Sequence, residues 1–226
     1  LLEKVCASGK PTVLVMLNGR PLSIVWANEH VPAILEAWEP GMMGGQAIAE
    51  ALFGDINPCG KLPVTVPYNV GQIQTIYNHK ASQYSRQFAL GHTGPLYPFG
   101  FGLSYTSYQY GKPVLSKDKI RKDESVTVSF DVTNTGKMDG TEIVQLYIRD
   151  EYGSITRPVK ELKGFQRVSL KAGETKRVEF AITPDDLKFY TVRKLWEVEP
   201  GDFTLMVGSS SADKDLQKLA LTVEGD

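Results

Sequence analysis

The first third of the chain carries its apolar residues in continuous runs. Residues 12–17 form an unbroken β-prone run, which is typical of a strand covered on both faces. Residues 33–38 lie between two prolines and predict a second strand, whereas residues 46–53 are rich in helix formers, are apolar at helical spacing and stop at Gly54. Because strand and helix alternate here, we expect the strands to pair in parallel.

Two weaker signals accompany this pattern. Residues 22–25 follow a turn signal and are expected to pair with the first strand or to continue it. Residues 61–67 are expected to be extended at a sheet edge, because Pro63 cannot donate a backbone hydrogen bond. One or two strand–helix units cannot close a sheet. We therefore interpret residues 1–67 as the second half of an α/β domain whose first half precedes Leu1.

Later in the chain, apolar and polar residues alternate strictly. Within residues 125–132 the apolar side chains occupy every second position and predict one buried face. Short alternating strands separated by turn signals over residues 112–226 predict an antiparallel β-sandwich whose charged residues lie on the outer faces. Further strands are expected at residues 143–148, 161–170, 175–182 and 202–207.

Residues 68–111 join these two parts and show little periodicity. Residues 1–111 contain six basic and six acidic side chains, against 19 and 20 in residues 112–226, so the composition also changes near this boundary. We therefore divide the chain into residues 1–67, a connecting segment at residues 68–111, and residues 112–226. The aromatic stretch at residues 95–106 is expected to be pinned against other surfaces.

Composition and charge exclude several classes of function. The 226-residue chain has a formal net charge of −1 and is 42% hydrophobic, which argues against wholesale disorder, a nucleic-acid-binding surface and binding to anionic membranes. Its longest aliphatic run, residues 13–17, is far shorter than the roughly 20 residues that span a bilayer. The chain opens without a Met or a signal-peptide pattern, so we expect it to be a segment of a longer protein.

The cysteines and histidines offer no pattern for a metal site. Cys6 and Cys59 are interpreted as small buried thiols in preference to a single bridge between them. The three histidines have no ligand-like spacing. We expect neither a metal nor another cofactor.

Other candidate chemistry in the first unit is sparse. The glycine-rich turn at residues 41–45 could present N–H groups to an anion, but tight strand-to-helix geometry is the favoured interpretation. Glu36, Glu39, Glu50 and Asp55 could supply an acid and a base, although the last two are expected on the solvent face or near the end of a helix. No histidine adjoins a nucleophile-like turn.

The connecting segment contains the best candidates for ligand contact. Tyr84 could stack on the face of a sugar ring, and Arg86 could clamp a hydroxyl or a carboxylate. His79, Lys80 and Ser85 complete this cluster. The alternative is that these are simply polar residues on a surface loop.

Four segments resemble the glycoside hydrolase family 3 β-glucosidases, in the order and at the spacing of that family. One of them reads GGQAIAEALFGDINPCGKLPVT, where Cys59 replaces the commoner Ser in a small-for-small change. Residues 157–174 look like the C-terminal fibronectin type III-like domain of the same family. The four segments are residues 9–21, 33–41, 44–65 and 95–106.

This resemblance implies a retaining β-glucosidase with an N-terminal (β/α)8 barrel, an α/β sandwich and a fibronectin-like domain. Residues 1–67 would be half of the α/β sandwich, with parallel-type strands and helices, and residues 112–226 the all-β fibronectin type III-like antiparallel sandwich. In such enzymes a nucleophilic Asp and an acid/base Glu stand about 5–5.5 Å apart, and the resemblance places both upstream of this chain. Glu3, Glu36 and Glu39 align with neither, so we assign no catalytic residue here and expect the isolated chain to be inactive.

The resemblance also implies partners and a location. The substrate would be a β-glucoside or an oligosaccharide bound by the longer enzyme, the missing barrel and sandwich half would be partners, and the protein would be periplasmic or secreted. The chain is compatible with a homo-oligomer. Two alternatives stay open: a β-xylosidase or another family 3 β-glycosidase, and a non-catalytic carbohydrate- or partner-binding module. The last would need an exposed aromatic platform, whereas Tyr190 and Trp196 are interpreted as single core residues.

Overall fold

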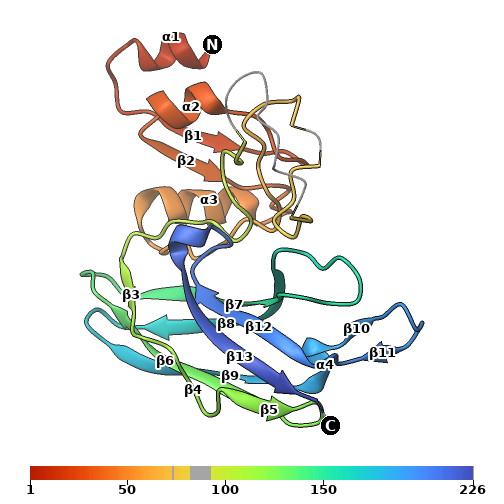
Figure 1. Ribbon diagram of the computed structural model, residues 1–226. Helices are drawn as coiled ribbons and strands as arrows, with labels where there is room; N and C mark the ends of the chain where they lie inside the picture. Colours follow the sequence, from red (N-terminus) through yellow and green to blue (C-terminus); the bar gives the residue numbers. More distant parts are fainter. Residues whose placement is uncertain (73, 82–92, 226) are drawn as a thin grey trace.

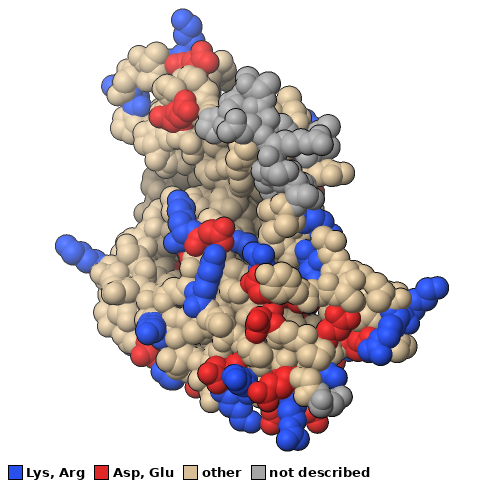
Figure 2. Space-filling model, viewed as in Figure 1, with Lys and Arg blue, Asp and Glu red and all other residues tan. Residues whose placement is uncertain are grey.

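The computed structural model describes residues 1–72, 74–81 and 93–225. Figure 1 shows a small α/β unit at the N-terminal end and a larger β-sandwich at the C-terminal end, with the connecting segment between them. Charged side chains cover the sandwich more densely than the N-terminal unit (Figure 2), in keeping with the change in composition along the chain.

Strands and helices alternate in the N-terminal unit. β1 and β2 pair in parallel, with Val13 opposite Ala33, which confirms the expected pairing. The expected helix is present and ends at Gly54, whose φ of 84° is left-handed and suits glycine. The elements are α1 (Leu2–Cys6), β1 (Val13–Met16), α2 (Val25–His30), β2 (Ala33–Glu36) and α3 (Gly44–Phe53).

The prediction for residues 22–25 was wrong. These residues neither pair with β1 nor continue it, because α2 begins at Val25. A short apolar run is equally compatible with a strand and with the start of a helix, and periodicity alone cannot separate the two.

Residues 61–67 are extended but form no regular strand. The N–H of Leu62 donates to the carbonyl of Phe101 at 2.8 Å, and the N–H of Val66 donates to the carbonyl of Tyr97 at 2.9 Å. Pro63 and Pro67 have no N–H to donate, and prolines of this kind are confined to the edges and ends of strands. The partner of this segment is therefore the aromatic stretch rather than β1 or β2.

The N-terminal unit buries little of its apolar surface. Among the described residues, β1 and β2 pair only with each other, which leaves their outer edges open. Leu17 is 62% exposed and Phe53 is 84% exposed. Parallel sheets are normally covered on both faces, so this unit needs a further neighbour. Its buried hydrophobic residues within residues 1–67 are Ala27, Val31, Ala51 and Val66.

The C-terminal unit is a sandwich of two sheets around one core. One sheet has the order β5-β13-β12-β7-β8; in the other, β6 pairs with β3, β4 and β9. The pairings are antiparallel except for β5 with β13, which is parallel and corrects the expectation of a wholly antiparallel sandwich. The strands are β3 (Tyr108–Tyr110), β4 (Val114–Leu115), β5 (Lys119–Arg121), β6 (Val126–Asn134), β7 (Gly140–Asp150), β8 (Glu161–Leu170), β9 (Thr175–Ile182), β12 (Gly201–Gly208) and β13 (Leu216–Glu224).

The alternating residues of these strands form the core as predicted. Every second side chain of β6 is at most 2% exposed, and those of β9 and β12 that were expected to point inward are at most 6% exposed. β3 already belongs to this sandwich, so the sheet begins within the predicted connecting segment. The inward residues are Val126, Val128, Phe130, Val132, Val178, Phe180, Ile182, Phe203, Leu205 and Val207.

A small hairpin projects from one end of the sandwich after the short helix α4 (Pro184–Leu187) (Figure 1). It consists of β10 (Phe189–Tyr190) and β11 (Trp196–Glu197). Tyr190 is 47% exposed and Trp196 is 67% exposed. Their interpretation as core residues was therefore wrong; the aromatic residue of this hairpin that points inward is Phe189, at 1% exposure.

The aromatic stretch is pinned between the two units, as expected. The ring of Phe99 stacks on Tyr77 with centroids 4.3 Å apart, and Tyr77 meets Tyr147 of β7 edge-on at 5.8 Å. The amide of Gln145, also on β7, donates to the carbonyl of Gly100 at 3.1 Å. β7 is therefore buried on both faces, by the opposite sheet and by the connecting segment.

A buried ion pair ties the same three parts together. The ammonium of Lys61 lies 3.3 Å from the carboxylate of Glu142 and donates to the carbonyl of Gly102 at 3.1 Å. The hydroxyl of Tyr110 donates to the same carboxylate at 2.8 Å. Burial raises the pKa of the Glu142 carboxyl, although Lys61 and Tyr110 act in the opposite direction.

Cys6 and Cys59 are both free, which confirms the preference for thiols over a bridge, but they are only partly buried, so the expected burial was wrong. The Sγ of Cys59 instead accepts a hydrogen bond from Arg167 at 3.4 Å. No helix among the described residues is long and apolar enough to cross a membrane.

Substitution of either partner of the ion pair should destabilise the fold. Lys61→Met leaves a buried carboxylate without its cation and should lower the free energy of unfolding by about 3 kcal/mol. The double variant Lys61→Met/Glu142→Gln removes both charges and should recover most of this loss. Denaturant unfolding of the two single variants and the double variant measures the coupling; strictly additive losses would contradict it.

The pH dependence of stability should change with Glu142→Gln. Since burial raises the pKa of Glu142 in the folded state, its contribution to stability is greatest below the ordinary carboxyl pKa of 4.5 and is lost as the pH rises through the raised value. The wild type should therefore lose stability from this group over that window, and the variant should not. Urea unfolding at closely spaced pH values tests this, and identical slopes in both proteins would argue against it.

Candidate functional site

The carboxyl ends of the parallel strands place a polar cluster at one edge of the N-terminal unit. This edge is where α/β sheets commonly bind ligands. Asn18 follows β1 and Glu36 ends β2, and the side-chain amide of Asn18 donates to both carboxylate oxygens of Glu36 at 3.1 Å. Glu36, a candidate acid or base in the sequence, is thus held by a residue that follows the neighbouring strand.

Trp38 adopts a strained conformation within this cluster. Its φ of 51° is left-handed, which is unusual for a bulky side chain. The backbone is held on both sides, because the N–H of Trp38 donates to Oε1 of Glu36 at 3.1 Å and its carbonyl accepts from the N–H of Asn18 at 3.2 Å. Strain of this kind is found at sites that position a side chain for function.

The turn before α3 is closed by its own backbone. The N–H of Gly44 donates to the carbonyl of Gly41 at 3.1 Å, and Gly41 has a left-handed φ of 71°. A Cβ at Gly44 would lie 2.5 Å from the ring of Pro40. These contacts confirm the interpretation of residues 41–45 as a tight strand-to-helix turn.

The candidate carboxylates do not form an acid–base pair. Glu36 binds Asn18 and Trp38, whereas Oε1 of Glu50 accepts from Gln46 of the same helix at 2.6 Å. Glu39 lies beside Gly19, and Asp55 is exposed just beyond α3, as expected. Within the described part of the chain, no group of three or more His, Cys, Asp or Glu side chains could hold a metal ion.

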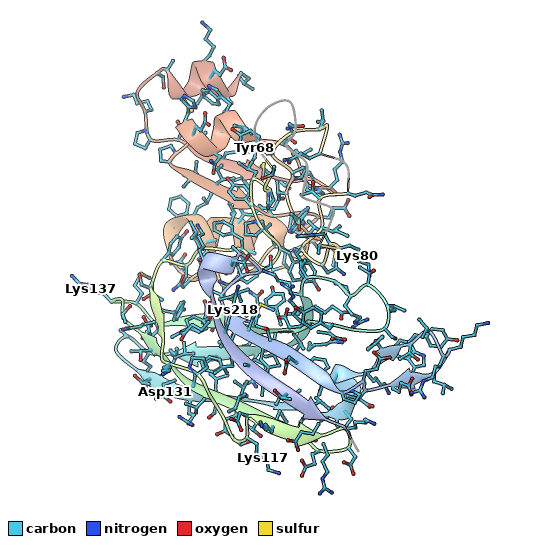
Figure 3. All side chains as sticks on the ribbon, viewed as in Figure 1. Tyr68, Lys80, Lys117, Asp131, Lys137 and Lys218 are labelled. Atoms are coloured by element: carbon cyan, nitrogen blue, oxygen red, sulfur yellow. The ribbon has the colours of Figure 1, made fainter. Side chains whose placement is uncertain are left out.

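A cavity of about 780 Å³ lies between the connecting segment and the outer face of β7, β12 and β13. Tyr77, Leu96 and Phe99 line one side, and charged residues line the other, among them Lys218 (Figure 3). The carboxylates in its lining already have partners: Glu151 with Arg149, Asp213 with Lys160 and Lys218, and Asp215 with Ser210.

The two residues predicted to contact a substrate, Tyr84 and Arg86, lie outside the described residues, as does Ser85. Their neighbours are anchored on the sandwich. The ammonium of Lys80 donates to the carbonyl of Thr156 at 2.5 Å, and the carbonyl of His79 accepts from the N–H of Val159 at 2.9 Å (Figure 3). These contacts place this end of the connecting segment against the β7–β8 connection.

Two family models match the chain. Residues 1–105 match the glycosyl hydrolase family 3 C-terminal domain, and residues 142–211 match the fibronectin type III-like domain. A β-xylosidase from Formosa agariphila is 46% identical over 99% of this chain, and a periplasmic β-glucosidase from Salmonella typhimurium is 45% identical over 94%. The chain spans 31% and 29% of the lengths of these two relatives.

Solved structures agree with this similarity. A β-glucosidase from Erythrobacter marinus superposes with a TM-score of 0.95 at 45% identity, covering 99% of this chain and 29% of that one. A Listeria innocua β-glucosidase in complex with laminaribiose superposes with a TM-score of 0.89 at 35% identity, covering 98% of this chain and 32% of that one.

The Glu36 carboxylate should be required for the conformation of Trp38. Glu36→Ala removes the acceptor for the Trp38 N–H and for the Asn18 amide, and should lower the free energy of unfolding by about 1–2 kcal/mol. Glu39→Ala is the matched control, because that neighbouring exposed carboxylate makes no hydrogen bond to the described residues. Denaturant unfolding measures both variants; equal losses would contradict the role of Glu36.

Proposed function

Because the chain belongs to glycosyl hydrolase family 3 through its C-terminal domain, which a fibronectin type III-like domain follows, we propose that it is the supporting part of a retaining β-glycosidase. In this proposal the α/β unit completes a sandwich domain, and the fibronectin-like unit holds that domain in place. The longer enzyme hydrolyses terminal β-D-glucosyl residues of oligosaccharides or glucosides.

The open β1–β2 sheet is the observation that carries this proposal. A parallel pair with exposed Leu17 and Phe53 is not a stable end state, so the unit has to be covered by further chain. Relatives about three times as long match nearly all of this chain, which is consistent with the cover being part of the same enzyme.

The reacting carboxylates are proposed to come from the rest of the enzyme. A retaining mechanism needs two carboxyl groups about 5–5.5 Å apart, one as nucleophile and one as acid and base. Glu36 is engaged in holding Trp38 and Asn18 and is paired with no second carboxylate among the described residues. This chain would then contribute Tyr84 and Arg86 to substrate binding, and Lys80 and His79 anchor the segment from which they extend.

A β-xylosidase is the second candidate, because the relatives include β-xylosidases as well as β-glucosidases. The two sugars differ by the hydroxymethyl group on C5, so a pocket that accommodates or excludes this group decides between them. The ratio of kcat/KM values for p-nitrophenyl β-D-glucoside and β-D-xyloside, measured on the enzyme that carries this chain, separates the two. We propose a periplasmic or secreted location, in line with the periplasmic relative.

The isolated 226-residue chain should not hydrolyse either aryl glycoside. The physical reason is that Glu36 and the carboxylates that line the cavity are already engaged with other side chains. The measurement is release of p-nitrophenol by the purified chain, with Glu36→Gln as a matched variant. Turnover by the wild-type chain that disappears in Glu36→Gln would refute the proposal.

A further inference from the structure

The β10–β11 hairpin is a rigid arm fastened to the sandwich. Phe189, at its base, is 1% exposed, and the guanidinium of Arg157 lies 4.4 Å above its ring. The position of Gly153 also adjoins this ring, since a Cβ there would lie 3.2 Å from its edge. The hairpin is therefore fixed at its base by the core and by the β7–β8 connection.

The turn of the hairpin is closed by hydrogen bonds. The N–H of Thr191 donates to the carbonyl of Leu195 at 3.0 Å, and the N–H of Lys194 donates to the carbonyl of Thr191 at 3.0 Å. The hydroxyl of Thr191, which is 3% exposed, donates to Glu197 at 2.8 Å. A turn held in this way keeps the strands on either side in one geometry.

Two aromatic rings stand exposed on this arm. Tyr190 and Trp196 are directly opposite in the strand register, and their ring centroids are 5.8 Å apart at an interplanar angle of 55°. They are 47% and 67% exposed, and Val192 and Leu195 beside them are 64% and 55% exposed. Exposed apolar groups gathered on a fixed projection are typical of a binding site.

An ion pair lies beside the rings. The guanidinium of Arg193 donates to both oxygens of Glu197, at 3.0 and 2.6 Å. Figure 2 shows charged side chains of both signs on the projecting arm. The guanidinium and the carboxylate of this ion pair, with the exposed ammonium of Lys194 in the same turn, offer hydrogen-bonding groups to the hydroxyls of a polar ligand.

We infer that Tyr190 and Trp196 bind a soluble chain of β-linked glucose or xylose. The axial C–H groups of these sugars form apolar faces that pack on aromatic rings, while their equatorial hydroxyls reach neighbouring polar groups such as Arg193 and Glu197. Rings tilted by 55° fit successive sugars of a twisted chain, whereas a flat crystalline surface requires coplanar rings. The choice of ligand rests on the proposed glycosidase function.

The test is retardation of the enzyme that carries this chain in native gels containing hydroxyethylcellulose or soluble xylan, with dextran as the α-linked control. Tyr190→Ala/Trp196→Ala should weaken retardation by about tenfold in apparent affinity. Tyr190→Phe/Trp196→Phe keeps both rings and should retain binding. Phe165→Ala, which removes an equally exposed ring (64%) on β8, should bind as the wild type does.

Each other outcome overturns the inference: no retardation of the wild type by either β-linked polymer, equal retardation by dextran, or equal retardation of the double alanine variant. A thermal melt checks that this variant is folded, and the single variants Tyr190→Ala and Trp196→Ala replace it if it is not. Retardation does not depend on turnover. A wild type that binds but hydrolyses no aryl glycoside would refute the proposed function, and one that hydrolyses but does not bind would refute this site.

Discussion

Two parallel strands alone cannot pair all their backbone hydrogen-bonding groups or bury both faces of their sheet. The whole N-terminal unit depends on this constraint. Its helical crossover covers part of one face, its outer backbone edges have no partner strand among the described residues, and apolar side chains such as Leu17, Met43 and Phe53 lie in solvent. The fold of this unit is therefore stabilised by the segments that pack against it. In this chain that support is the connecting segment and, through it, the β-sandwich.

The β-sandwich has a complete hydrophobic core of its own and can provide that support. Its core residues Val128, Val132 and Leu205 have no exposed surface. β7 connects this core to the connecting segment, because Gln145 and Tyr147 on its second face contact that segment. The approach is close enough to require glycine: a Cβ at Gly100 would lie 2.1 Å from the Gln145 side chain, and one at Gly102 would lie 2.2 Å from the carbonyl of Gly60.

The periodicity of apolar residues predicts strands and helices well, but it predicts poorly what packs against them. The alternation in residues 175–182 and the helical spacing before Gly54 predicted β9 and α3, since each pattern reflects one buried face. The same alternation is present in β13, with Leu219, Leu221 and Val223, and would have revealed that strand. Alternation does not state whether a face meets another sheet. Tyr190 and Trp196 lie outside the alternating strands, and their interpretation as core residues rested only on each being a single aromatic residue.

The burial of Glu142 shows the same limit for polar residues. An acidic residue in a strand is expected on the solvent face, and only the arrival of Lys61 and Tyr110 from other segments makes its burial tolerable. The contact of Glu36 with Trp38 is local in sequence, yet it depends on a left-handed tryptophan that propensity does not predict. Tyr84 and Arg86 lie outside the described residues, so their assignment stays a prediction.

Several carboxylates of this chain stabilise its fold, and this bears on where in the enzyme catalysis can occur. Glu36 holds a strained tryptophan, Glu142 neutralises a buried lysine, and Asp213 accepts from the ammonium of Lys160, whose side chain is 9% exposed. Glycosylating any of them during a catalytic cycle would remove an interaction on which the local fold depends. A retaining glycosidase needs carboxylates that can change their bonding while the frame around them stays fixed. In the proposed enzyme the reacting carboxylates belong to the rest of the protein, and this chain supplies the fixed structure around them.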